Sequence, residues 1–274
     1  MIELPEAKVL AKQISETIVG RRVKKVTAAK NPHKFAWYYG NPQEYPGLLM
    51  GKAIGAAASY GGMVEIPAGD ATLLFADGVN LRYFAAQEKL PDKHQLRIEF
   101  EDDSSLVGSV QMYGGLWVFP TGSFQNKYYQ LSKEKTPPLS DAFGRAYFDS
   151  LFSESTKKLS LKAFLATEQR IPGLGNGVLQ DILFNAKMHP KKKVNTLSSK
   201  DKEELLHSLK ATLTQMVDGG GRDTETDLNG NPGGYTTLLS KNTVNKPCST
   251  CGTIIRKEAY MGGSIYFCPH CQKT

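Results

Sequence analysis

Cysteine is absent from most of this chain. All four cysteines of the 274 residues lie between Cys248 and Cys271, so disulfides cannot hold the whole fold together. The sequence also lacks any apolar run near the roughly 18 residues of a membrane-spanning helix, and we expect no membrane partner. The first residues have no basic region followed by an apolar one, which argues against a secretory leader. We therefore expect a cytoplasmic protein.

Acidic residues are the scarcer charged class. Lys and Arg number 34 against 27 Asp and Glu, which gives a formal net charge of +7 and a pI of about 9.1. Such a surplus favours a polyanionic partner, although a basic protein without one has the same composition. The chain contains 40% hydrophobic residues. Its length and this composition suit two domains, each with a packed core.

The hydrophobic pattern changes about halfway along the chain. Pro5 and Glu6 suit the first turn of an N-terminal helix, which Gly20 can end. Between residues 22 and 119, short alternating segments separated by turn residues predict several strands, as in a β-sandwich or barrel. Helical periodicity runs from about residue 141 to residue 218. The expected divisions are a sheet domain at 1–130, a linker at 131–140, a helical domain with a long loop at 141–243 and a C-terminal unit at 244–274.

A glycine-rich turn, Pro172-Gly173-Leu174-Gly175-Asn176-Gly177, separates two helix-patterned segments. Pro172 and the glycines forbid a continuous helix, and Asn176 is a good N-cap for the second segment. Unpaired backbone N–H groups at a helix N-terminus form a phosphate site, which glycines make approachable. An ordinary connection between two core helices explains the same residues, so the turn alone leaves both interpretations open.

The four cysteines form two local pairs. Cys248-x2-Cys251 and Cys268-x2-Cys271 are separated by sixteen residues, and this pattern is typical of a zinc site. Four thiolates close a tetrahedral site, so one Zn²⁺ would be structural and would leave no position for a substrate. Ile254-Ile255 and residues 265–267 predict the two strands of a β-hairpin finger. Two disulfides are the alternative, but the reducing environment of the cytosol, where we expect this protein, disfavours them.

Three segments in this order resemble the formamidopyrimidine-DNA glycosylase/endonuclease VIII family of DNA repair proteins. They are the start Glu3-Leu4-Pro5-Glu6, the turn Gly173–Asn176 followed by His189-Pro190, and the four-cysteine finger. The resemblance runs nearly end to end and implies an α+β fold. Its parts are an N-terminal β-sandwich with an N-terminal helix, a C-terminal helix–two-turns–helix domain and a β-hairpin zinc finger.

The resemblance also implies a partner and an interface. It implies a monomer that binds damaged or abasic double-stranded DNA between its domains and flips a base, associated with the nucleoid if the source is bacterial. Asn176 would bind a phosphate beside the lesion, and Arg222 lies in the loop where the family reads the extruded base. Residues 111–113 would fill the space that a flipped base leaves, although an aromatic strand residue is more often core. The residues expected at DNA are Gly173, Gly175, Asn176, Gln111, Met112, Tyr113 and Arg222.

The chain departs from the family pattern where the chemistry is expected. Active members attack the sugar C1′ with the secondary amine of an N-terminal proline, but Ile2 occupies that position here. If Met1 is retained, its α-amine lies one residue too far out, and such misplacement is costly. Gly62 and Gly263 stand where alignment places the catalytic lysine and the finger arginine. Glu3 keeps the position of the acid/base carboxylate, although a charge favoured at a helix start explains it equally.

Three hypotheses therefore stay open. The first is a DNA glycosylase/AP lyase acting on N-glycosyl bonds, compromised at its nucleophile, whose candidate catalytic residues are Met1, Ile2 and Glu3. The second is a non-catalytic protein that binds lesions on the same scaffold. The third is an unrelated zinc-finger protein whose turn binds another polyanion such as RNA. The sequence does not name the lesion, because the chemistry of the long loop is not decodable.

Overall fold

The computed structural model describes residues 1–273, and its chain opens with helix α1, Leu4–Thr17. Glu3 is the N-cap of α1, and Pro5 lies in the first turn, where its missing N–H costs nothing. The apolar stripe of this helix, including Leu10 and Ile14, is buried in a core shared with the following sheet. Within residues 1–273, no helix is long and apolar enough to cross a membrane.

The N-terminal lobe is built on a sheet that takes in seven strands of the described chain. The strand order is β1-β6-β7-β5-β4-β3, and β2 pairs with β7 off this path. Val26 of β1 and Ile66 of β4, near opposite ends of the sheet, belong to one core, so the sheet curls around it. This arrangement confirms an N-terminal sheet domain. The elements of the lobe after α1 are β1 Val23–Ala28, β2 Ala36–Trp37, η1 Pro42–Glu44, α2 Tyr45–Leu49, β3 Ala58–Tyr60, β4 Met63–Ala68, β5 Ala71–Phe84, β6 Leu96–Phe100 and β7 Ser105–Pro120.

A bulge interrupts the central pair of strands, β5 and β7. Asp77 pairs with Gly114 and Val79 pairs with Val110, so residues 111–113 lie opposite Gly78 alone. A Cβ on Gly78 would lie 2.3 Å from the carbonyl oxygen of Tyr113, which only glycine avoids. The bulge therefore lets the 111–113 segment protrude from the sheet.

The second lobe is helical and has its own core. Ser198 caps the long helix α7 by accepting a hydrogen bond from the Asp201 N–H at 3.1 Å, as its position before the apolar stripe favours. Helix α3 lies across the predicted domain limit at residue 130, and its Tyr129 packs on the outer face of the sheet. The helices are α3 Lys127–Glu134, α4 Arg145–Ser150, α5 Leu161–Ala166, α6 Val178–Asn185, η2 Val194–Thr196 and α7 Ser199–Asp218.

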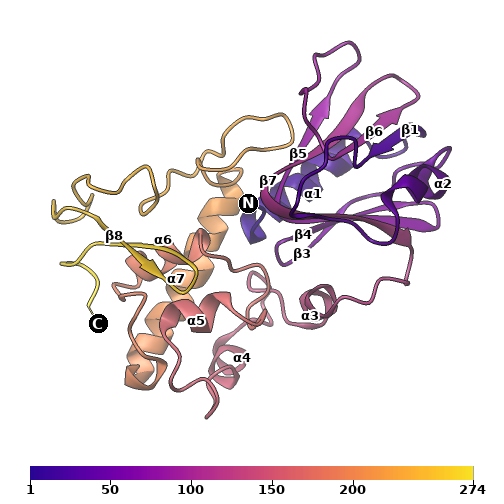
Figure 1. The fold of residues 1–274 in the computed structure, drawn as a ribbon. Coiled ribbons are helices and arrows are strands. Elements are labelled where there is room, and N and C mark those ends of the chain that lie inside the picture. The colour runs from indigo at the N-terminus through magenta and orange to yellow at the C-terminus, as the bar shows by residue number, and fades with distance from the viewer. Residues whose placement is uncertain (274) are drawn as a thin grey trace.

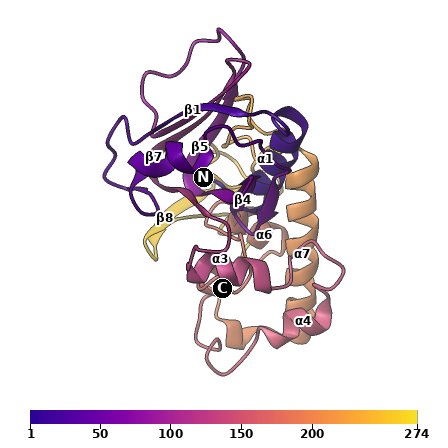
Figure 2. The ribbon, with the colours of Figure 1, turned by 90° about the vertical axis from the view of Figure 1, so that its right-hand side faces the viewer.

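The C-terminal hairpin consists of antiparallel strands β8, Arg256–Tyr260, and β9, Gly263–Phe267. Its first strand begins at Arg256, so the expectation of a strand at Ile254-Ile255 is wrong: Ile255 instead packs in a small core with Phe184 of α6. Figure 1 shows the sheet lobe and the helical lobe with the N-terminus between them. Figure 2, from the side, shows the long α7 along the helical lobe.

Candidate nucleic-acid interface

The first turn of α1 meets the glycine-rich turn before α6 through a buried carboxylate. Glu3 is only 4% exposed. Its two oxygens each accept a hydrogen bond of 2.8 Å, one from the Gly177 N–H and one from the Val178 N–H. A carboxylate is favourable at the positive end of a helix, so Glu3 caps α6 from a distant part of the chain. Asn176 is therefore not the N-cap that the sequence predicts, and these two N–H groups are not available to a phosphate.

The glycines of this turn permit close contact with the N-terminal segment. A Cβ on Gly175 would lie 2.5 Å from the Glu3 Cδ, and one on Gly177 would lie 1.6 Å from Nη1 of Arg222. Gly173, at a φ of +82°, would place a Cβ 2.5 Å from the carbonyl carbon of Gly61. All three positions exclude a side chain for internal reasons, and the predicted contact of Gly173 and Gly175 with DNA stays a prediction.

Asn176 joins the turn to the finger. Its Nδ2 donates to the carbonyl oxygen of Ser264 at 2.9 Å, and the Tyr266 N–H donates to Oε1 of Gln180 on α6 at 3.0 Å. These contacts hold β9 against the start of α6. The phosphate-binding role of Asn176 remains a prediction, but the structure adds a second role, which is to position the finger.

Arg222 is buried in an ion pair. It is 2% exposed, and its Nε and Nη2 donate to the two oxygens of Glu6 at 2.9 and 2.7 Å. Its Nη1 also lies 3.7 Å from the Glu3 carboxylate. The two-pronged geometry suits a guanidinium. The side chain of Arg222 therefore fastens the long loop to α1, and its predicted contact with DNA stays a prediction.

The start of the chain lies where the bulge of β5 and the long loop meet. The Met1 ammonium forms an ion pair with Glu225, and the Ile2 N–H donates to the Asp77 carbonyl at 2.5 Å. Tyr113 places its hydroxyl 3.8 Å from the Met1 sulfur. Burial raises the pKa of the Asp77 carboxyl, an effect that the nearby N-terminal charge opposes. Sequence reasoning missed Glu225 and Asp77, since no motif marks either residue.

A cleft of about 160 Å³ opens beside this N-terminal segment. It contains the predicted residues Met1, Ile2 and Gln111, and it adds polar groups from the long loop and from β5. Among the described residues, Oδ1 of Asn80 is buried without a hydrogen-bond partner. Convergent polar groups in a cleft are typical of a ligand site. The lining residues are Met1, Ile2, Glu6, Leu10, Gly78, Val79, Asn80, Leu81, Gln111, Thr224, Glu225 and Thr226.

The two glycines at expected cation positions have different neighbours. A Cβ on Gly62 would lie 3.1 Å from the Ile2 carbonyl oxygen, so a side chain there would start beside the N-terminal segment. A Cβ on Gly263 would lie 3.5 Å from Nζ of Lys162 and 3.6 Å from Nδ2 of Asn176. Lys162 therefore places a cation next to Gly263, where the resemblance predicts the finger arginine, and no sequence motif indicates this lysine.

The side chain of Lys162 is buried and hydrogen-bonded to the finger. It is 6% exposed, and its Nζ donates to the Tyr260 carbonyl at 2.5 Å. Burial lowers its pKa. The protruding segment of β7 differs in character, because Met112 is 67% exposed there. The structure thus sets a lysine on the finger side and an exposed apolar side chain on the sheet side.

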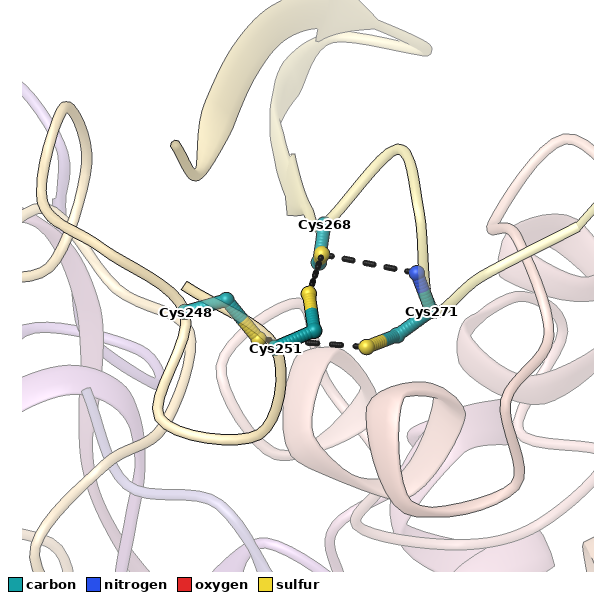
Figure 3. Close-up of side chains that lie close together, drawn as sticks. All are labelled: Cys248, Cys251, Cys268 and Cys271. Carbon is teal, nitrogen blue, oxygen red and sulfur yellow. Dashed lines mark hydrogen bonds between the residues drawn. The ribbon is translucent and has the colours of Figure 1, made fainter. Parts of the chain in front are cut away.

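The four cysteines converge from two loops (Figure 3). Their sulfurs all lie within 4.8 Å of one another. The Sγ–Sγ distances are 3.9 Å for Cys248 and Cys271 and 3.5 Å for Cys251 and Cys268. Ligands about 2.3 Å from a tetrahedral zinc lie about 3.8 Å apart, whereas a disulfide is about 2.05 Å long. The donor set therefore fits one structural Zn²⁺, as the sequence predicts.

Comparison with known proteins agrees with this geometry. Residues 1–111 match the family model of the formamidopyrimidine-DNA glycosylase N-terminal domain, and residues 135–227 match that of the formamidopyrimidine-DNA glycosylase H2TH domain. The formamidopyrimidine-DNA glycosylase of Cytobacillus firmus is 27% identical over 99% of this chain and 100% of its own. That of Histophilus somni strain 2336 is 34% identical over 58% of this chain and 57% of its own.

Solved structures show the same fold. The Lactococcus lactis Fpg in complex with abasic-site DNA superimposes with a TM-score of 0.82 at 24% identity, covering 99% of this chain and 100% of that one. The Thermus thermophilus MutM (Fpg) protein gives 0.80 at 22% identity, with 98% of both chains covered. The two family models together span both lobes, and full-length relatives match the whole chain. The chain therefore belongs to the formamidopyrimidine-DNA glycosylase/endonuclease VIII family of DNA repair proteins.

Proposed function

We propose that this protein binds damaged or abasic duplex DNA between its two lobes and carries out the base-excision and AP-lyase chemistry of its family weakly. The observation that supports this most is the position of the cleft beside Met1 and Ile2. It lies at the junction of the protruding 111–113 segment, the N-terminal segment and the long loop. An extruded nucleotide placed there would meet the start of the chain, as base flipping requires.

The weakness of the chemistry follows from the groups at this position. The Ile2 nitrogen is an amide that donates to the Asp77 carbonyl, so it has no lone pair for attack. The Met1 amine is paired as an ammonium with Glu225, and it must lose this contact and a proton to become a nucleophile. Gly62 supplies no second amine. Both oxygens of Glu3 accept hydrogen bonds from the start of α6. The carboxylate must give up one of these bonds before it can act as an acid or base.

A non-catalytic lesion-binding protein is the second candidate. The ion pair between Met1 and Glu225 favours it, because the amine is engaged within the DNA-free molecule. In the enzyme, an amine would condense with the C1′ aldehyde of an abasic site, release water and form an imine that borohydride reduces. In the binding protein, no imine forms.

Borohydride trapping on a duplex with one abasic site separates the two candidates. A covalent band on a denaturing gel, mapped to the Met1 peptide, would support the enzyme. No band, with the same protein shifting the same duplex on a native gel, would support the binding protein. Failure to shift an abasic duplex at low salt would contradict the whole proposal, since phosphate contacts strengthen as salt falls.

A further inference from the structure

A second hollow lies beside the protruding segment of β7. Its lining is apolar, whereas that of the N-terminal cleft is largely polar. It is a shallow apolar groove of about 740 Å³. Three of its side chains are large, apolar and open to solvent: Phe35 is 48% exposed, Trp37 is 42% exposed and Met112 is 67% exposed. Exposed apolar patches of this kind mark interaction sites. The lining residues are Pro32, His33, Lys34, Phe35, Trp37, Gln111, Met112 and Tyr113.

The fold holds these rings in place. Strand β2 pairs in parallel with β7 at Ala36–Gly114 and Trp37–Gly115, immediately after the protruding segment. The Gly114 N–H donates to the Phe35 carbonyl at 3.0 Å. The rings of Trp37 and Tyr113 lie 5.6 Å apart between centroids. The aromatic surface is therefore mounted on the sheet and is continuous with Tyr113, whose hydroxyl contacts Met1.

The one charged side chain among the described lining residues favours an anionic partner. The described residues that line it include no carboxylate, whereas they include Lys34, with its Nζ 5.3 Å from the centre of the Phe35 ring. Aromatic faces next to lysines form the usual surface for unpaired nucleobases, because each base has a π-face and each nucleotide a phosphate. A paired base has both faces covered by its neighbours in the stack, so it offers no face to Trp37.

Resting on the proposed function, we propose that Phe35, Trp37 and Met112 form a stacking platform for an unpaired DNA base next to the lesion. The protein then favours lesions in locally single-stranded or mismatched DNA over the same lesion in a fully paired duplex. The lesion itself occupies the N-terminal cleft, and the neighbouring unpaired base occupies the platform.

The test compares two duplexes that carry the same abasic analogue, one fully paired and one with mismatches flanking the lesion. We expect wild-type protein to bind the mismatched duplex about tenfold more tightly, within the range for one stacked base. Trp37→Ala should remove this preference and leave binding to the paired duplex unchanged. Tyr128→Ala is the matched control, because Tyr128 is 52% exposed on α3 outside the groove.

Fluorescence reports on the platform directly. The chain has two tryptophans, and Trp117 is buried at 8% exposure. In Trp117→Phe, the signal comes from Trp37 alone, and we expect the mismatched duplex and a lesion-free single strand to quench it. Full preference in Trp37→Ala, or unquenched Trp37 with bound mismatched DNA, would overturn the platform. Quenching by single strands without any shift of abasic duplexes would keep the platform and refute the proposed function.

Discussion

The zinc finger and the N-terminal junction are built in opposite ways. The finger takes its four ligands from residues 248–271, and their spacing alone indicates the metal. The junction brings together Glu3 before α1, Gly177 from the turn before α6 and Arg222 from the long loop. Glu3 and Gly177 are 174 positions apart in the chain. A site whose residues lie close together in the chain can therefore be predicted from the sequence. A site whose residues lie far apart can be predicted only when one knows which segments meet.

The largest effect is expected at the finger. Cys268→Ser removes one of four thiolates from a site whose metal contributes about 10–16 kcal/mol to folding. We expect the finger to unfold and DNA binding to be lost, because Asn176 and Gln180 hold β9 against α6. Zinc content and a native gel measure both effects. Ser249→Ala is the control, because Ser249 is an exposed residue between two of the ligands. DNA binding that survives complete zinc removal would contradict the structural role.

At the junction, Arg222→Met should have the next largest effect. It leaves Glu3 and Glu6, which are 4% and 5% exposed, without their cation. Breaking a buried pair in this way costs about 3–5 kcal/mol. Denaturant unfolding measures the loss. Lys12→Met is the matched control, since Lys12 forms an exposed pair with Glu16 that is worth about 1 kcal/mol or less. Equal losses in both variants would refute the buried-junction account.

The chemistry of the junction can be tested by restoring the two missing groups. Ile2→Pro combined with Gly62→Lys should permit removal of Met1 and place a secondary amine at the position of the Ile2 nitrogen. A Cβ at position 62 meets the Ile2 carbonyl at 3.1 Å, so the lysine needs only a small adjustment. We expect borohydride trapping to rise at least about 100-fold, because a misplacement of only about 1 Å already costs that much.

Mass spectrometry must confirm the new N-terminus in that experiment. Ile2→Leu with Gly62→Lys is the control, because it retains Met1 and the N–H that donates to Asp77. If the double variant binds abasic DNA but traps no better than this control, the position of the amine is not what limits the chemistry.

The smallest effect is expected at Lys162, on the side of the finger. Lys162 reaches from α5 to the finger carbonyl of Tyr260, beside Gly263. If it contacts a phosphate, Lys162→Met should lower DNA affinity and reduce the slope of log affinity against log salt by about 0.9. Lys246→Met, an exposed finger lysine, is the control. A slope unchanged by Lys162→Met would restrict this lysine to a structural role.

Much of the architecture was predictable because its signals are local. The apolar stripe of α1, the capped α7 and the cysteine spacing each operate within a few turns of chain. The predicted N-cap at Asn176 failed for the opposite reason. A cap from Glu3 satisfies the same N–H groups better, because a carboxylate carries a full charge. The pairing of Arg222 with Glu6 was likewise not predicted, because the two residues are far apart in the chain.

Periodicity and spacing predicted the order of the lobes and the zinc ligands, because these signals follow from local geometry. The family was indicated by the resemblance of three short motifs. Alignment to the family pattern also predicted the departures at Ile2, Gly62 and Gly263. The contacts that the other site residues make could be known only from the folded structure. Folding paired Met1 with Glu225, placed Lys162 beside Gly263 and left the ring of Trp37 open to solvent. These outcomes depend on long-range packing, which no local pattern encodes.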